Sequence, residues 1–508
     1  MSLAPSLGDV VPQPAPSPIE SALQSGSGIN ATHLDLLRRF YAARQGTPAW
    51  YDRNGLNGDG RAALAVLSRA SEEALDPARY ELENLSRPFA TSDAAALAYR
   101  DLTFTESMLR YASDMLDGQA ALKHIDSDID LPSSGYDIAS GAAAALGSHR
   151  ISEFLWGLEP QVPQYAPLKA ALAQYRAVAA KGGWPNFAAR KPFSAASATP
   201  QTLAELQARL AYEDLAVAGP MPASVEEMDA AVRRFQARNG LEAEGRVGSG
   251  TIAQLNVTAS ERAAEIAANM ERLRWLPHQF ENTYVQVNVP DASLAVMENG
   301  APVLTSRVIV GRPHDRTPIF RAEITGIVAN PPWIVPAVIA RREITPKAAA
   351  NPNYLARNHI VFENGQYRQI PGDDNALGYL KLNVSDRFSV YLHDTPARSL
   401  FARPYRFLSH GCIRVQQIKP LASYALSGDT TSGIDRLEAA IATTQTTHLE
   451  IKMPIPLYVV YLTAFPASDG LQFRPDIYGR DKRLIAAMFG ATSFTQAIPS
   501  VSGCNHKA

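Results

Sequence analysis

The chain has 508 residues, with 48 Lys and Arg against 50 Asp and Glu and a formal net charge of -2. This length allows roughly two to four domains with ample buried cores. No basic block runs along the chain, so nucleic acid is not an expected partner. No apolar run approaches the roughly 18 to 20 residues that span a bilayer, which predicts a soluble mature protein.

The chain has two cysteines, Cys412 and Cys504. Two are too few for a disulfide framework, and they lack the C-x-x-C spacing of zinc or redox sites. They can still pair with each other, but that would consume the candidate nucleophile described below. We interpret Cys504, in the polar tail, as free or incidental.

The N-terminal region divides into two parts by composition. Residues 1–28 are rich in Pro, Ser and Gly, which predicts a disordered linker that can tether the protein to a membrane or leader. The start lacks a charged segment followed by an apolar one, so no signal peptide is expected within the sequence. Residues 29–195 carry apolar residues at helical spacing and are predicted to form a helical domain. Residues 52–60 resemble a calcium loop, but the twelfth position is Ala63 instead of Glu, so a solvated turn is favoured.

Residues 196–258 have the pattern of a small helical unit, with helices predicted around residues 204–211 and 228–236. The predicted core consists of Val232, Phe235, Leu241, Val247, Ile252 and Leu255. The order of core residues and turn glycines, at Gly240, Gly245 and Gly248, resembles the three-helix peptidoglycan-binding module. A spacer without glycan affinity is an equal alternative.

The pattern changes again beyond a connecting segment at residues 259–280, which contains a predicted helix ending before Pro277. Residues 281–508 are predicted to form the next domain. Beyond Asn282 polar and apolar residues alternate with period two, and Asn299-Gly300 separates two such runs, which indicates a hairpin. Further strands are predicted near residues 324–329, 388–392, 448–453 and 457–462. The predicted fold class is therefore α+β and multidomain, with a β-rich C-terminal domain.

The strongest motif in the chain lies in this β-rich domain. Tyr391-Leu392-His393-Asp394 is followed, after residues 395–408, by Ser409-His410-Gly411-Cys412-Ile413-Arg414. This pattern resembles the catalytic signature of the L,D-transpeptidases of the YkuD type. A lone Cys or His is more often structural, but the combination at this spacing favours catalysis.

The residues of the motif have separate predicted roles. Cys412 is the expected nucleophile, its thiolate favoured by a neighbouring protonated imidazole, and His393 is its expected base. The resemblance implies that the main-chain carbonyl of Asp394 holds the other ring nitrogen of His393. Main-chain N–H groups around Gly411 and Cys412 are expected to face the oxyanion. Ser409 and His410 are expected to support the loop, and Arg414 either to orient a substrate carboxylate or to brace the loop.

The resemblance extends to the large Gram-negative subgroup that carries a scaffold domain and a peptidoglycan-binding module. Asn330-Pro331-Pro332-Trp333-Ile334-Val335-Pro336 and nearby segments look like its substrate-capping region, predicted at about residues 336–388, and residues 471–479 look like its closing stretch. Trp333, Tyr379 and Tyr391 are candidates for the substrate groove, although core packing is at least as good an interpretation for Trp333. A closing cap would exclude water and favour aminolysis over hydrolysis.

The resemblance implies a cysteine acyltransferase of the periplasm that joins diaminopimelate residues of peptidoglycan tetrapeptide stems and releases D-Ala. It also implies no metal or organic cofactor, and carbapenems as covalent inhibitors. Water, a free D-amino acid or a lipoprotein lysine are alternative acceptors that the sequence does not separate.

Two other classes of protein fit the sequence less well. A wall-binding scaffold with a vestigial catalytic domain would not need His393, Gly411 and Cys412 together. A wall hydrolase of the cysteine peptidase class normally has its nucleophile before its His, and no Ser-x-x-Lys supports a serine enzyme of the penicillin-binding class.

Overall fold

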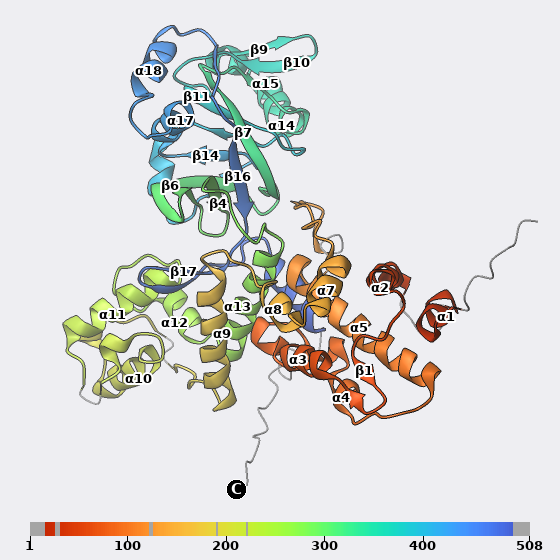
Figure 1. Cartoon of the computed structure of the whole chain (residues 1–508). Helices are drawn as coiled ribbons and strands as arrows, with labels where there is room; N and C mark the ends of the chain where they lie inside the picture. The colour runs from red at the N-terminus through yellow and green to blue at the C-terminus, as the bar shows by residue number, and fades with distance from the viewer. Residues whose placement is uncertain (1–15, 26–30, 121–124, 189–190, 220–221, 491–508) are drawn as a thin grey trace, which may run out of the picture. The chain divides into compact units, whose positions relative to one another are not determined.

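The computed structural model describes residues 16–25, 31–120, 125–188, 191–219 and 222–490 (Figure 1). The chain forms two compact units, Met1–Gln119 with Ser134–Pro160, and Ala120–Ser133 with Gln161–Ala508. The first is helical, and the second combines helices with a large β-sheet, which confirms the predicted α+β class. Within the described ranges, no helix is long and apolar enough to cross a membrane.

The first unit is built from helices around a core that includes Trp50 and Phe104. Its elements are α1 (Pro18–Ser25), α2 (Ala31–Ala43), β1 (Tyr51–Asp52), β2 (Gly55–Leu56), α3 (Gly58–Leu67), η1 (Ala70–Glu73), η2 (Pro77–Tyr80), α4 (Leu82–Ser86), α5 (Ala94–Asp117), α7 (Ile138–Gly147) and α8 (Ile151–Trp156). The expected calcium-like loop is a turn, as favoured: β1 and β2 form a hairpin, and Asn57 caps α3 by accepting from Gly60 N at 2.8 Å.

The prediction of a disordered linker over residues 1–28 is wrong for residues 18–25. Helix α1 buries Ile19 and Leu23 in the core of the first unit, because two apolar side chains one turn apart give this short segment a face to pack. The remainder of that prediction, residues 1–15 and 26–28, lies outside the described residues.

The prediction of one helical domain over residues 29–195 is also wrong at two segments. Residues 120–133 belong to the second unit, where β3 (Ile129–Asp130) pairs in parallel with β7 (Ile319–Ala329). Helix α9 (Tyr165–Ala180) packs on α13 (Ala259–Arg274) in the same unit. Buried Arg274 donates to the Tyr165 hydroxyl at 2.7 Å, a polar contact between the two helices that helical periodicity does not reveal.

The predicted small helical module is present. It consists of η3 (Ala195–Ser197), α10 (Pro200–Leu210), η4 (Leu215–Val217), α11 (Val225–Arg238) and α12 (Ser249–Leu255). Of its predicted core residues, Val232, Phe235, Val247 and Leu255 are buried, whereas Leu241 and Ile252 are only partly so. Gly240 and Gly245 have positive φ, as the turn prediction requires, but Gly248 is extended.

The β-rich domain is a sheet that closes on itself (Figure 1). The pairings run in the order β11, β12, β14, β6, β5, β4, β16 and β7, and β11 pairs with β7 as well as with β12. The strands are β4 (Thr283–Asn288), β5 (Ser293–Glu298), β6 (Ala301–Gly311), β7, β11 (Leu380–Val384), β12 (Leu392–His393), β13 (Phe407–Ser409), β14 (Ile413–Val415), β15 (Thr447–Leu449) and β16 (Ile455–Val460). The predicted Asn299-Gly300 turn joins β5 and β6, and both residues have positive φ.

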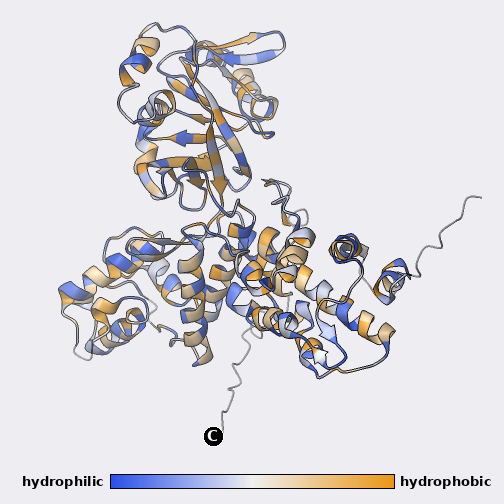
Figure 2. Cartoon of the chain, viewed as in Figure 1, coloured by the Kyte–Doolittle hydropathy of each residue, from blue (hydrophilic) through white to orange (hydrophobic). Residues whose placement is uncertain are grey.

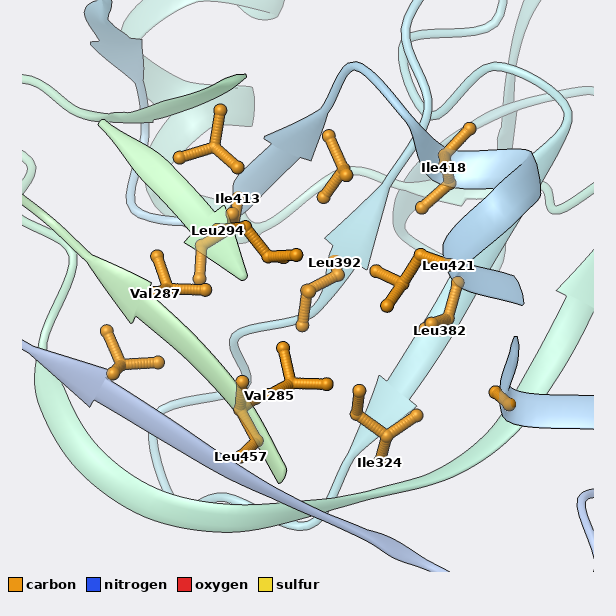
Figure 3. Close-up of a cluster of buried hydrophobic side chains, with 14 of the residues drawn as sticks. Val285, Val287, Leu294, Ile324, Leu382, Leu392, Ile413, Ile418, Leu421 and Leu457 are labelled. Atoms are coloured by element: carbon orange, nitrogen blue, oxygen red, sulfur yellow. The ribbon is translucent and has the colours of Figure 1, made fainter. Parts of the chain in front are cut away.

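The apolar positions of these strands form one core inside the closed sheet. Figure 3 shows the buried side chains converging, with Val285, Val287, Leu294, Ile324, Leu382, Leu392, Ile413 and Leu457 contributed by strands and Ile418 and Leu421 by α17 (Ile418–Ser427). In Figure 2 hydrophobic and hydrophilic residues alternate along the strands of this domain. The alternate residues of the same strands therefore point out of the core, and three of them form part of the site described below.

The region predicted as a cap forms a small structure of its own. It contains β8 (Trp333–Ile334), α14 (Ala337–Ile339), the π-helical turn η5 (Ala340–Ile344), α15 (Thr345–Ala350), α16 (Tyr354–Arg357), β9 (Ile360–Glu363) and β10 (Gln366–Gln369). Its core is Val335, Ile344 and Ile360. Its first strand starts at Trp333, before the predicted boundary at 336, and β11 already belongs to the main sheet, so the boundary at 388 is too late.

Two predicted strands are shorter in the structure. The strand expected at 388–392 is reduced to β12, because Ser389 has a positive φ that extended backbone does not tolerate. The strand expected at 448–453 ends at Leu449. The domain is completed by η6 (Arg398–Ala402), α18 (Ile434–Ala442), β17 (Ala464–Ala467), β18 (Gly470–Phe473) and α19 (Arg480–Phe489).

Candidate active site

Three neighbouring strands bring His393 into a row of polar side chains on the outside of the closed sheet. Lys381 on β11 pairs directly with His393 on β12, and His393 pairs with Arg414 on β14. The residues next to them, Leu382, Leu392 and Ile413, point into the core. Side chains alternate between the faces of a strand, so Lys381, His393 and Arg414 share the outer face.

Cys412 lies on the turn that leads into β14, and this turn is fixed by side-chain hydrogen bonds. The Ser409 hydroxyl donates to Cys412 O at 2.6 Å and accepts from Gly411 N at 3.1 Å. Gly411 has a φ of +114°, and a Cβ there would lie 3.2 Å from Arg316 O. Glycine is therefore required both by the backbone conformation and by the close approach.

The Gly411 N–H cannot serve freely as an oxyanion donor, because Ser409 already accepts from it. We expected N–H groups around Gly411 and Cys412 to face the oxyanion, and this hydrogen bond occupies the one on Gly411. Among the described residues, none accepts a main-chain hydrogen bond from Cys412 N, so that group remains the candidate. Ser409 holds the loop, as expected of a supporting residue.

A second set of hydrogen bonds joins this turn to Thr317 and Tyr478. The buried Thr317 hydroxyl donates to Gly411 O at 2.8 Å and accepts from Gly311 N at 2.9 Å. The Tyr478 hydroxyl donates to Gly311 O at 2.7 Å and accepts from Thr317 N at 3.2 Å. Tyr478 lies in the closing stretch singled out in the sequence, but nothing in the local pattern pointed to Thr317.

Cys412 and His393 open onto one cavity of about 1060 Å³. Arg414, Tyr391 and Trp333 are also in its lining. The Tyr391 and His393 rings are 5.5 Å apart at an interplanar angle of 62°, and the Tyr391 hydroxyl contacts both the Cys412 thiol and the Trp333 indole. Trp333 also packs against the cap core, so it both lines the cavity and contributes to packing, and its role in binding substrate stays a prediction.

The expected pairing of a thiolate with a protonated imidazole is not the state that this geometry favours. Burial, with the nearby positive charges of Arg414 and Lys381, lowers the pKa of His393 to about 3, against a smaller opposing contribution from the Asp394 carbonyl. Burial also raises the pKa of the Cys412 thiol, although Tyr391 and Lys381 oppose this. Both groups are therefore neutral near pH 7.

Asp394 is placed close to the imidazole, as the resemblance implied, but the contact is loose. Its main-chain carbonyl is near enough to raise the His393 pKa, yet His393 Nδ1 is buried without a hydrogen bond of normal geometry to any described atom. The Asp394 carboxylate points elsewhere, accepting from Arg398 at 2.6 Å and from Tyr379 N at 3.2 Å.

Tyr379 is not part of the groove. It lines a separate cavity with Asp394 and Arg398, and its main-chain N–H donates to the Asp394 carboxylate at 3.2 Å. The structure separates Tyr379 from the groove lined by His393 and Cys412, and its role in binding substrate stays a prediction. His410 does reach the groove, where Nε2 lies 2.6 Å from Oε1 of Glu343 in the cap turn η5.

Sequence reasoning missed Lys381 and Glu343. The signal for Lys381 was a charged residue between two leucines of a strand, Leu380-Lys381-Leu382, next in the sheet to the catalytic motif. Glu343 had no comparable signal, because its contact with His410 joins residues 67 positions apart. Among the described residues, no group of three or more His, Cys, Asp and Glu is arranged to hold a metal.

A cysteine and a histidine in one groove, with a candidate oxyanion donor on the same turn, are typical of cysteine-dependent acyl-transfer enzymes and hydrolases. Comparison with known families identifies the domain. Residues 282–434 match the L,D-transpeptidase catalytic domain, residues 35–172 the "Scaffold domain" and residues 199–255 the "Putative peptidoglycan binding domain". The chain therefore contains a catalytic domain of the L,D-transpeptidase family, of the YkuD type, together with these two accompanying domains.

One curated relative has a name of the same family. A protein of Haemophilus influenzae with the name "Putative L,D-transpeptidase" is 35% identical over 243 residues, which are 43% of this chain and 48% of the relative. The chain thus spans about half the length of this curated relative. Among solved structures, the L,D-transpeptidase of Xylanimonas cellulosilytica is 14% identical, covering 53% of this chain and 98% of that one, with a TM-score of 0.19. That of Stackebrandtia nassauensis is 15% identical, covering 50% and 88%, with a TM-score of 0.20.

Proposed function

We propose that this chain is an L,D-transpeptidase that links diaminopimelate residues of two peptidoglycan stems. The observation that supports this most is the convergence of Cys412 and His393 on one groove within a domain of that family. In the proposed reaction Cys412 is the nucleophile and His393 the base.

The reaction starts from a neutral thiol and a neutral imidazole. His393 takes the proton from Cys412 as the sulfur attacks the carbonyl of diaminopimelate in a tetrapeptide stem. The C–N bond to the terminal D-Ala then breaks, and His393 returns the proton to the leaving amine. The amine of a second stem attacks the resulting thioester, loses a proton to His393 and releases the Cys412 thiol.

Other groove residues have supporting roles in this proposal. Cys412 N–H stabilises the oxyanion of the tetrahedral intermediates. Arg414, which has no ion-pair partner among the described residues, orients a carboxylate of the stem, and Tyr391 and Trp333 form an aromatic wall. The cap around Glu343 excludes water and so favours the amine over hydrolysis.

Location and partners follow from the substrate. The stems lie in the periplasm of Gram-negative bacteria, so we place the protein there, with the peptidoglycan-binding module of residues 199–255 holding it near the wall. Carbapenems are expected to acylate Cys412 because they present a strained carbonyl to the same nucleophile.

The test is to incubate the protein with a disaccharide-tetrapeptide and follow D-Ala release and dimer formation by mass spectrometry. Wild type should give both products, and Cys412→Ala should give neither. Cys504→Ala is the matched control and should retain both. D-Ala release without dimers would show a carboxypeptidase activity and contradict the proposed transpeptidase activity. Dimers from Cys412→Ala would refute the assignment of the nucleophile.

A further inference from the structure

Lys381 carries a charge that the reaction proposed above does not use. It lies on β11 directly beside His393, on the outer face of the sheet. Its ammonium group is 4.4 Å from the centroid of the Tyr391 ring, and the Tyr391 hydroxyl contacts the Cys412 thiol. Lys381 is therefore separated from the reacting sulfur by one aromatic side chain.

The environment of Lys381 contains no carboxylate partner. Within the described part of the chain it forms no ion pair within 4.0 Å, and the side chain is half-buried. Removing an ammonium group from water without a partner is unfavourable, and the cation–π contact with Tyr391 offsets only part of this cost. An anion that forms nearby during the reaction would offset the rest of this desolvation cost.

The other charged groups around Cys412 and His393 are mostly paired. Each has a polar partner of its own, at the following closest distances between side-chain atoms: Asp394 with Arg398 at 2.6 Å, Glu343 with His410 at 2.6 Å, Arg312 with Asp315 at 2.6 Å, and Arg316 with Asp126 at 3.0 Å. Asp386, on the loop before β12, accepts from two main-chain N–H groups with one oxygen, while its other oxygen has no partner. Lys381 and Arg414 remain as cations without an ion pair among the described groups.

These two cations differ in their access to substrate. Arg414 lines the groove, whereas Lys381 is not in its lining. A substrate carboxylate can therefore meet Arg414, but Lys381 acts through space on groups that the protein itself supplies. The group with which its charge interacts on the far side of Tyr391 is the Cys412 thiol.

We propose that Lys381 is the counter-charge of the Cys412 thiolate, acting on the sulfur from behind Tyr391 and without contact to substrate. This deepens the proposed function, and it rests on Cys412 being the nucleophile. His393 is neutral at rest and becomes positive only after it has taken the thiol proton, whereas Lys381 carries its charge throughout and favours the thiolate as it forms. The same charge adds a smaller contribution to the burial and the Arg414 charge that lower the pKa of His393.

The test measures the thiol directly and needs no transpeptidase turnover. In a Cys504→Ser background, the rate at which iodoacetamide alkylates Cys412 is followed by mass spectrometry from pH 6 to 10.5. Lys381→Met removes the charge and keeps much of the length. We expect it to raise the apparent pKa of Cys412 by about one unit and to slow alkylation about tenfold below that pKa.

Two further variants separate charge from structure. Lys381→Arg keeps the charge and should retain the wild-type pH profile, and Lys419→Met removes an exposed lysine that pairs with Glu438 and should change nothing. If Lys381→Met does not fold, as judged by circular dichroism, Lys381→Gln takes its place. An unchanged profile in the folded neutral variant, or an equal shift in Lys419→Met, would overturn the proposal. Because alkylation requires only a thiol, a failed transpeptidase assay would not affect this result.

Discussion

The imidazole of His393 links the chemistry of the site to the stability of the domain. Its pKa in the folded protein is about 3, whereas an unfolded histidine titrates near 6.5. Between these values the unfolded chain binds a proton that the folded chain does not. Stability is therefore complete above about pH 6.5 and falls as the pH decreases toward 3, with a slope of up to about 1.4 kcal/mol per pH unit from this residue.

Replacing His393 by Gln should remove this contribution. We expect the stability of the second unit to fall less steeply between pH 6.5 and 4 in His393→Gln than in wild type, as measured by pulse proteolysis in urea with detection of peptides from that unit. His149→Gln, which changes an exposed histidine of the first unit, is the matched control. Identical slopes in wild type and His393→Gln would show that the imidazole is not held neutral by the fold.

At the scale of elements, the cap meets the nucleophile turn through a hydrogen bond between Glu343 and His410. Glu343 on the π-helical turn η5 contacts His410 at 2.6 Å, and Lys347 of α15 lies 4.0 Å from the same carboxylate. A π-helical turn inside a helical segment often marks a functional position. This turn directs Glu343 toward the groove, whose lining includes both Glu343 and His410.

We expect Glu343→Ala to increase the share of hydrolysed tetrapeptide relative to dimer by about two- to tenfold, because loss of one hydrogen bond of roughly 0.5 to 1.5 kcal/mol admits water more often. The ratio is measured by mass spectrometry of the products. Glu363→Ala, which breaks an exposed pair with Arg368 in the same cap, should leave the ratio unchanged. A constant ratio in both variants would mean that this contact does not control access of water.

Local sequence patterns predicted the positions of helices and strands better than they predicted which of these elements pair or pack together. Period-two alternation and the Asn299-Gly300 turn located the hairpin of β5 and β6 because both signals are contained within a few residues. The pairing of β11 with both β12 and β7 joins distant segments, so no local signal identified Lys381 as the neighbour of His393. Likewise, α1 was missed because a short helix between a proline-rich and a Gly/Ser-rich segment is stabilised by tertiary packing, which composition does not describe.

At the scale of the whole molecule, residues 120–133 connect two stretches of the first unit yet fold with the second. Asp126 in this segment is buried and contacts Arg316, Arg480 and Arg483 at 3.0 to 3.1 Å. Arg480 is only 2% exposed, so its guanidinium depends on such partners. The carbonyl of Arg316 in turn packs beneath Gly411 of the nucleophile turn.

Removal of the Asp126 carboxylate should therefore destabilise the second unit, both in this segment and at the active site. We expect Asp126→Ala to destabilise that unit by about 3 kcal/mol, since it leaves a buried arginine with one carboxylate fewer. Hydrogen exchange followed by mass spectrometry should show faster exchange in residues 125–133, 313–318, 409–412 and 480–489, and unchanged exchange in α2 and α5 of the first unit.

Asp130→Ala provides the comparison within the same segment. Asp130 pairs with the exposed Arg387 at 3.0 Å, and an exposed pair of this kind contributes at most about 1 kcal/mol. Its exchange pattern should stay close to wild type. If the two variants behaved alike, or if exchange around Gly411 stayed unchanged in Asp126→Ala, the segment would be a passive connection. A selective effect of Asp126→Ala would make the segment a structural support of the active site. That support would come from a part of the chain that precedes the catalytic domain by about 150 residues.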